Sequence, residues 1–308
     1  MIVPLPPQLH VFVRDWLSGN QVVLRGNDGH VVVDSGYGKH VPLTLALVAS
    51  RQGLDGDELA WVINTHCHSD HMGGNAALRR AYGCRIAVPA GEAPHVRAWD
   101  QRALLLGAAG QHAEAFDVDH ELVAGTTERW GDLDWRLLAA PGHDMAALVF
   151  FNDAHGILIS GDALWADGFG FVMPPDMEPQ ALPATRATLD LIASLPVRAV
   201  IPGHGEPFTD HRGALERAYR RLAAFEAEPA RLARHAVKVL VTFALLDRER
   251  MALDALDDIC ATIPLVREFN DRHLHKAPAD LTQWIVAELT RAGVAALHDD
   301  ALVARPGR

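Results

Sequence analysis

Short apolar runs separated by turn residues fill the first third of the chain. Residues 22–24 and 30–34 flank the turn at 26–29, a pattern that predicts a β-hairpin. The runs that follow predict a helix, a strand covered on both faces, a second helix and a second strand, over residues 41–52, 59–64, 74–82 and 85–89.

The second part of the chain repeats an order in which an apolar strand is followed at once by an ionisable residue. Strands are predicted over residues 135–139, 147–151, 156–160 and 197–201, with a helix over 181–195. His143, Asp162 and His204 each follow one of these strands. Ligand sites of open sheets lie beyond the carboxyl ends of the strands, so we expect these side chains to face a site. The alternation predicts a layered αβ arrangement with two sheets.

The pattern changes near residue 215. Helical periodicity covers residues 215–245, 251–262 and 279–292, and two β-like runs then surround Asp299-Asp300 at 295–304. Helices followed by a small hairpin predict a winged-helix-like appendage. We therefore divide the chain into a catalytic domain, residues 1–215, and a smaller, mostly helical domain, residues 216–308.

Composition and charge narrow the functional classes. Hydrophobic residues make up 49% of the 308 residues and charged residues 22%, as in ordinary globular proteins. No uninterrupted apolar stretch approaches the roughly 18 residues of a membrane span, and the N-terminus lacks the pattern of a secretory signal. Three scattered cysteines favour a reducing compartment, the cytoplasm. The net charge of −11 lies in residues 1–216, which favours a small-molecule substrate over nucleic acid there.

The run of residues 65–71 carries the chemistry. His66 and His68 alternate along an extended segment, so both point to one side while Cys67 points to the other. Asp70 and His71 lie where the chain turns into a helix, close enough to face a second ion. His143, Asp162 and His204 complete a set of five imidazoles and two carboxylates. Such a set suits two borderline-soft divalent ions, and a shared carboxylate can bridge them.

With these residues the chain resembles the metallo-β-lactamase superfamily over about residues 10–215. The resemblance implies an αββα four-layer sandwich and a binuclear zinc centre, with manganese or iron as alternatives. It implies that Asp34 supports the site without binding metal. It also implies one metal on His66, His68 and His143, a second on Asp70, His71 and His204, and Asp162 as the bridge. Aspartate at the fourth motif is similar to the glyoxalase II, lactonase and phosphodiesterase branches.

The predicted mechanism is hydrolysis by a hydroxide held between two metals roughly 3.5–4 Å apart. The hydroxide attacks a carbonyl or phosphoryl group, and Asp162 and Asp70 are the catalytic carboxylates. Asp70 orients the nucleophile or passes a proton.

An apolar lip beside the metals is predicted from the residues after the fourth motif. Trp165, Phe169, Phe171 and Met173 form this candidate substrate pocket, and a helical insertion at 92–112 covers it. Phe171 replaces the arginine that glyoxalase II enzymes carry after this motif, which disfavours glutathione. The alternative interpretation is that these aromatics only pack the insertion onto the sheets. An ester, thioester or lactone with a hydrophobic chain fits the lip best.

Two other functions stay open from sequence alone. The tail resembles that of the β-lactamase-like protein 2 group, which implies a single-strand endoribonuclease, and its helix at 217–238 carries a basic run. An iron-dependent persulfide dioxygenase needs only one metal held by two histidines and a carboxylate. The tail itself is predicted to bind nucleic acid, to cover the pocket or to form a homodimer.

Overall fold

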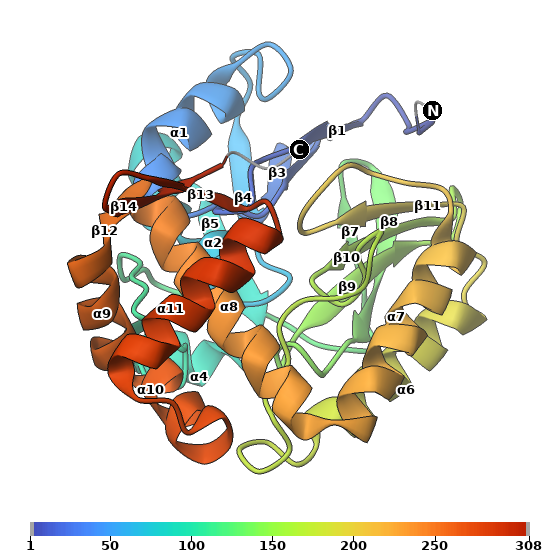
Figure 1. The fold of residues 1–308 in the computed structure, drawn as a ribbon. Coiled ribbons are helices and arrows are strands. Elements are labelled where there is room, and N and C mark those ends of the chain that lie inside the picture. Colours follow the sequence, from blue (N-terminus) through green and yellow to red (C-terminus); the bar gives the residue numbers. More distant parts are fainter. Residues whose placement is uncertain (1–2, 306–308) are drawn as a thin grey trace.

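The computed structural model describes residues 3–305 and contains two β-sheets packed face to face between helices (Figure 1). The first sheet has the strand order β1-β2-β3-β4-β5-β6. Its strands are β1 Leu9–Phe12, β2 Gln21–Leu24, β3 His30–Val33, β4 Leu59–Ile63, β5 Arg85–Pro89 and β6 His120–Leu122. β2 and β3 form the predicted antiparallel hairpin, while β3 to β6 run parallel.

The second sheet has the order β11-β10-β9-β8-β7. Its strands are β7 Thr127–Trp130, β8 Leu133–Ala139, β9 Leu148–Asn152, β10 Ile157–Gly161 and β11 Ala199–Pro202. The predicted hairpin of β9 and β10 is antiparallel, and β11 joins β10 in parallel. Both β10 and β11 are buried along their whole length.

Three hydrophobic clusters fix the four layers. Between the sheets, Ile63, Trp135 and Phe150 belong to one buried cluster. The outer face of the first sheet is covered by η1 Gly38–His40, α1 Val41–Ala49, α2 Ser69–Met72, α3 Asn75–Tyr82, α4 Ala93–Ala98 and α5 Leu106–Ala109. α6 Ala181–Ser194 and α7 His211–Ala227 cover the second sheet. The predicted αββα sandwich is confirmed.

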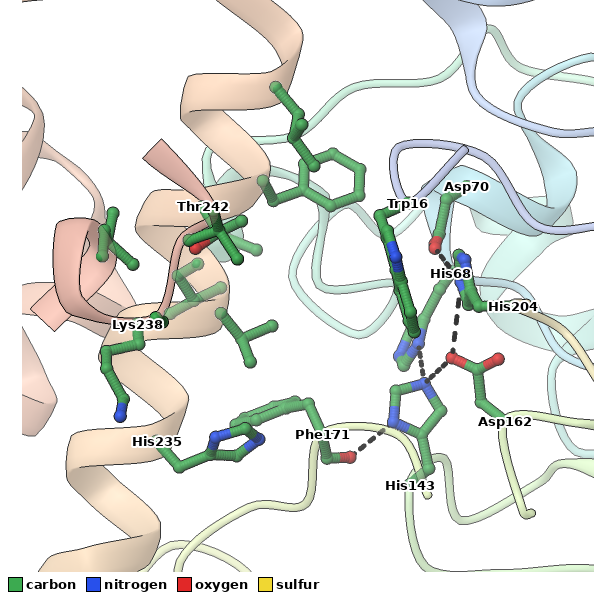
Figure 2. Close-up of a pocket in the computed structure, with 18 of the residues that line it drawn as sticks. Trp16, His68, Asp70, His143, Asp162, Phe171, His204, His235, Lys238 and Thr242 are labelled. Atoms are coloured by element: carbon green, nitrogen blue, oxygen red, sulfur yellow. Dashed lines mark hydrogen bonds and ion pairs between the residues drawn. The ribbon is translucent and has the colours of Figure 1, made fainter. Parts of the chain in front are cut away.

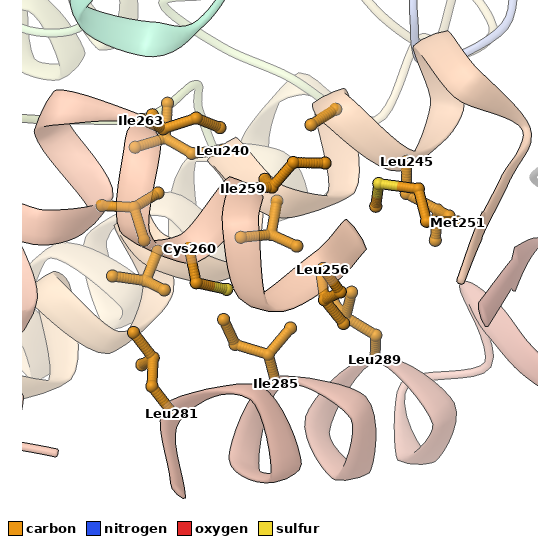
Figure 3. Packing of buried hydrophobic residues seen from close by; sticks show 14 of the residues in the cluster. Leu240, Leu245, Met251, Leu256, Ile259, Cys260, Ile263, Leu281, Ile285 and Leu289 are labelled. Carbon is orange, nitrogen blue, oxygen red and sulfur yellow. The ribbon is translucent and has the colours of Figure 1, made fainter. Parts of the chain in front are cut away.

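The C-terminal part has its own core of apolar side chains (Figure 3). It consists of α8 Pro229–Arg248, β12 Arg250–Ala252, α9 Leu253–Thr262, α10 Pro264–Phe269, the π-helical turn η2 Asn270–Leu274, α11 Pro278–Arg291, β13 Ala295–His298 and β14 Ala301–Ala304. The three strands form a small antiparallel sheet in the order β12-β14-β13. The predicted hairpin at 295–304 is confirmed, whereas the winged-helix-like assignment stays a prediction.

The helical composition predicted over residues 215–245 is confirmed, but the single helix predicted for the basic run 217–238 is wrong, because this run spans α7 and α8. The chain leaves helical geometry at Glu228, and Pro229 starts a new helix, because proline has no N–H to donate and fits a first turn. The predicted domain boundary at 215/216 lies inside α7, whose Leu215 and Leu222 pack with the second sheet. The division into 1–215 and 216–308 stays a prediction, and its outermost residues 1–2 and 306–308 lie outside the described part.

Two further features concern the cysteines and the possibility of a membrane-spanning helix. All three cysteines are buried and free. Between residues 3 and 305, no helix combines the length and apolarity needed to cross a bilayer, and the longest, α8, has 20 residues.

Candidate metal centre

Five strand ends deliver the predicted ligands and the supporting residue Asp34 to one edge of the sandwich. Asp34 follows β3, and the segment of residues 64–68 follows β4. The second sheet contributes the three later residues after β8, β10 and β11: His143, Asp162 and His204. Figure 2 shows His68, Asp70, His143, Asp162 and His204 gathered on one side of a pocket. The structure thus brings together side chains up to 138 positions apart, from His66 to His204.

His66, His68 and His143 form the first group whose nitrogens lie close enough to hold one ion. Nδ1 of His68 is 2.8 Å from Nε2 of His143. Cys67 points away into the cluster between the first sheet and its helices, where burial raises the pKa of its thiol well above the usual value. The alternation predicted for this segment therefore separates ligand positions from a packing position.

Asp70, His71 and His204 form a second group, and Asp162 lies between the two. Nε2 of His204 is 3.1 Å from Oδ2 of Asp70. Asp162 directs Oδ1 to His71 Nε2 and Oδ2 to His143 Nε2, each at 3.4 Å. One carboxylate thus faces both groups, which is the placement a bridging ligand requires.

Asp34 holds the second group in place from behind. Its carboxylate accepts hydrogen bonds from His71 Nδ1 at 2.8 Å and from the backbone N–H and hydroxyl of Thr65, both at 2.9 Å. Its backbone is left-handed, with φ at 58°, a conformation that aspartate tolerates better than most residues. Because Nδ1 of His71 carries the proton, Nε2 is free to bind a cation.

Glycines let the strand ends approach each other. A Cβ at Gly203 would lie 2.2 Å from Oδ1 of Asp162, and one at Gly170 would lie 2.7 Å from Nδ1 of His143. Neither position has room for a side chain. The close packing fixes Asp162 against the loop after β11 and His143 against the loop after β10.

The electrostatics of the centre fit divalent cations. Nε2 of His66 and Nε2 of His71 are buried and have no hydrogen-bond partner. Within residues 3–305, no lysine or arginine forms a salt bridge with Asp34, Asp70 or Asp162. Burial opposes charge on Asp162, yet His71 and His204 hold the pKa of its carboxyl well below the usual value. Buried ring nitrogens without hydrogen-bond partners and clustered carboxylates are costly unless a cation satisfies them.

A cavity of about 1040 Å³ opens in front of the centre. Of the predicted apolar lip, Trp165 and Phe171 line it. Phe169 and Met173 do not: Phe169 is buried beneath the second sheet's helices, and Met173 packs against hydrophobic clusters. The insertion at 92–112 contributes Leu105, Ala109 and Gln111 to the wall, so part of it covers the site as expected.

Sequence reasoning missed Trp16, a 44% exposed residue between β1 and β2. Its ring stacks on His204 at a centroid distance of 5.4 Å and an interplanar angle of 8°. Trp165 meets the same imidazole edge-on at 5.3 Å, and its indole N–H donates to Oδ1 of Asp162 at 3.2 Å. Trp16 belongs to no motif, so nothing local in the sequence distinguishes it from an ordinary loop residue.

The far wall of the cavity is made by α8, on the opposite side from the histidines (Figure 2). It presents mostly apolar side chains, with charged and imidazole groups toward its beginning: His235, Lys238, Val239, Leu240, Thr242, Phe243 and Leu246. The C-terminal part therefore encloses the cavity, one of the roles predicted for it.

Comparison with known families agrees with this geometry. The family model of the metallo-beta-lactamase superfamily matches residues 14–204, more than half of the chain. The chain belongs to the metallo-β-lactamase superfamily. Membership together with the histidine and aspartate groups indicates that the centre binds divalent metal ions.

The similar named proteins and the similar crystal structures match different lengths of this chain. Hydroxyacylglutathione hydrolases from Hyphomonas neptunium and Rhodopseudomonas palustris are 29% and 31% identical over 160 and 153 residues. These alignments cover 50% and 48% of this chain, so it spans about half (54% and 52%) of the relatives' own length. A crystallised beta-lactamase domain protein from Burkholderia ambifaria is 21% identical with a TM-score of 0.59, covering 98% of this chain and 94% of its own. That likeness shows a shared fold.

Proposed function

We propose that this protein is a metal-dependent hydrolase of a small-molecule ester, thioester or lactone. The observation that supports it most is the position of Asp162, whose two oxygens face two separate ligand groups at the mouth of a mostly apolar cavity. Relatives named hydroxyacylglutathione hydrolase support a hydrolytic reaction. The predicted ribonuclease and persulfide dioxygenase activities draw no support from those relatives.

In this proposal, the first ion is held by His66, His68 and His143, the second by Asp70, His71 and His204, and Asp162 bridges them. Zinc suits these nitrogen and oxygen donors, as do manganese and iron to a lesser degree. When bound, the ions supply Lewis acidity toward a carbonyl and lower the pKa of water.

The chain's own groups prepare the centre for this role. Phe171 offers its backbone carbonyl to the Nδ1–H of His143, which leaves Nε2 of that ring free for a ligand bond. Asp34 does the same for His71. Trp165 orients Asp162, and together with Trp16 it covers His204 and shields that side of the centre from water. Asp70 is the remaining candidate for orienting the nucleophile or passing a proton.

Glutathione is not the expected substrate. The side chain of Phe171 lies where glyoxalase II enzymes are expected to carry arginine. The centroid of its ring is 6.2 Å from that of Phe269. No lysine or arginine occurs between Arg136 and Arg186. A chain with apolar carbons suits this part of the cavity better than a peptide with free carboxylates.

The test starts from protein purified without added metal. Elemental analysis should find two zinc or manganese ions per chain, and a single iron would instead indicate the oxygenase. A substrate panel of thioesters, lactones and phosphodiesters then identifies the class. Asp162→Ala should abolish turnover and lower the metal content. The control is Asp153→Ala, an exposed aspartate between β9 and β10 that pairs with Arg136 and does not line the cavity. Full activity of Asp162→Ala with unchanged metal content would refute the bridging assignment.

The cytoplasmic location and the homodimer predicted from the sequence stay predictions.

A further inference from the structure

A second hollow of about 710 Å³ lies beside the cavity, between α7, α8 and α11. Arg221, His235 and Lys238 line both spaces, so the two hollows share a wall. His235 and Lys238 lie on α8 across the cavity from the metal centre (Figure 2). A ligand that begins at the metals can therefore reach this wall.

Positive charge dominates the second hollow. Its lining contains the cations Arg220, Arg221, Arg231, Arg234, Lys238 and Arg291 and the acids Glu228 and Glu288. Glu228 pairs with Arg234, while Glu288 pairs with both Lys238 and Arg291. Within residues 3–305, the other three arginines form no salt bridge. The hollow thus holds more cations than its carboxylates can neutralise.

Arg221 is the most constrained of these cations. Its guanidinium lies over the rings of Phe169 and Phe225, at 5.1 and 5.5 Å, and it donates to Nε2 of His235. A Cβ at Gly168 would lie 2.8 Å from its Nη1, so the loop backbone packs closely against it.

In the described part of the chain no carboxylate forms a salt bridge with Arg221, and the neighbouring imidazole cannot balance its charge. Burial lowers the pKa of Arg221 to about 10. Burial, followed by the charges of Arg221 and Lys238, lowers the pKa of His235 to about 3, so this imidazole is neutral at pH 7. A sequestered cation without a counter-charge is costly unless an anion binds it.

The space between the metals and these cations is apolar. It is lined by Leu105, Phe171, Val239, Leu240, Phe243 and Leu265. The charged backbone of an RNA strand would lose its hydration there without compensation. A ligand with an uncharged middle part and an anionic end suits this arrangement better, because apolar side chains lie between the metal centre and the cations. Three cations without salt bridges match a multiply charged phosphate better than one carboxylate, and guanidinium groups bind phosphate with paired hydrogen bonds.

Resting on the proposed hydrolase function, we infer that the substrate is a thioester or ester whose arm carries phosphate groups at the end remote from the scissile carbonyl. Arg221 at the shared wall binds those phosphates together with Arg220 and Arg231 in the second hollow. The cations act on substrate affinity and not on the bond-breaking step.

Binding is tested first, because it needs no turnover. Adenosine 3′,5′-bisphosphate is titrated into the full-length protein by calorimetry. Arg231→Gln and Arg221→Gln should each weaken its binding about 10- to 100-fold, the value of a hydrogen bond to a charged group. Arg231 is exposed, so its variant folds even if Arg221→Gln does not. Arg212→Gln, on the same helix α7 but outside the hollow, is the matched control. Equal binding by all four proteins would refute the subsite.

Turnover then tests the substrate class with decanoyl-coenzyme A and decanoyl-pantetheine, which share the thioester and the pantetheine arm and differ by the phosphorylated adenosine end. The wild type should show a KM about 10- to 100-fold lower for the phosphorylated member with similar kcat, and Arg231→Gln should lose most of that preference. Equal kcat/KM for the pair, or cleavage of single-stranded RNA in preference to both, would overturn the inference about substrate. If neither thioester is cleaved but bisphosphate still binds through Arg231, the hydrolase proposal fails and the subsite stands.

Discussion

Replacing Asp34 by asparagine would remove one negative charge behind His71 and little else. Asparagine tolerates the left-handed backbone at this position as aspartate does, so the loop keeps its shape. The amide oxygen can still accept from the backbone N–H of Thr65, now at 2.9 Å from Oδ1. The amide nitrogen takes the place of Oδ2 and faces the Nδ1–H of His71, at a spacing of 2.8 Å where two donors meet. The Thr65 hydroxyl, which donates to Oδ2 in the wild type, can rotate and accept from the amide instead.

His71 can answer this conflict only by moving its proton to Nε2, the atom that faces Asp162 and the second ligand group. One hydrogen bond to a charged group is lost, a change of about 1.5–3 kcal/mol. That energy corresponds to roughly a 10- to 100-fold loss of metal affinity, the usual range for residues that orient a ligand. The first ligand group does not contact Asp34, so we expect the second ion to be lost first.

Competition with a chelating dye measures both affinities, and elemental analysis at limiting metal gives the ion count. Asp34→Asn should hold close to one ion per chain under conditions where the wild type holds two. Asp55→Asn is the control, since Asp55 has a similar left-handed backbone, with φ at 51°, but is exposed and remote from the centre. Identical affinities for the two variants would show that the charge of Asp34 does not orient His71.

Three further predictions concern other parts of the molecule. Trp16→Ala should leave the metal content unchanged and raise KM in steady-state assays, because it uncovers His204 without touching a ligand bond; a lower ion count would contradict this. As the pH falls from 6.5 to 3, His235→Asn should lose less free energy of unfolding than the wild type, measured by urea unfolding. The pKa of His235 is about 3 in the folded protein, so in this range the unfolded wild type binds a proton that the folded protein does not, and the stability of the wild type falls as the pH falls. Equal pH slopes would count against it. Leu256→Ala, in the C-terminal core, should lower the free energy of unfolding by about 2–5 kcal/mol, and a loss below 1 kcal/mol would show that the core repacks.

Most of the catalytic edge was predictable because its signals are short-range. An apolar strand followed by a polar residue requires only a few neighbouring positions, and each of the four segments with predicted ligands shows it, as does the segment with Asp34. The alternation from His66 to His68 likewise follows from strand geometry alone.

What the sequence did not reveal depends on contacts between distant segments. Residues 163–173 contain little regular structure, so alternation could not tell that Phe171 faces the cavity while Phe169 is buried. β12 has three residues and forms only because β14 pairs with it. The position of Trp16 beside the centre depends on its stacking against His204 in the loop after β11. The break at Glu228 had a local signal in Pro229, which an amphipathic pattern continuing on both sides obscured.

The two walls of the cavity come from different stretches of the gene. Residues up to His204 supply every predicted metal ligand, whereas α8, from Pro229 to Arg248, supplies the facing surface. Substitutions in α8 can thus change which substrates enter the cavity while the metal centre and its reaction stay the same. Relatives with the same ligand residues and a different C-terminal part are therefore expected to differ in substrate before they differ in the reaction they catalyse.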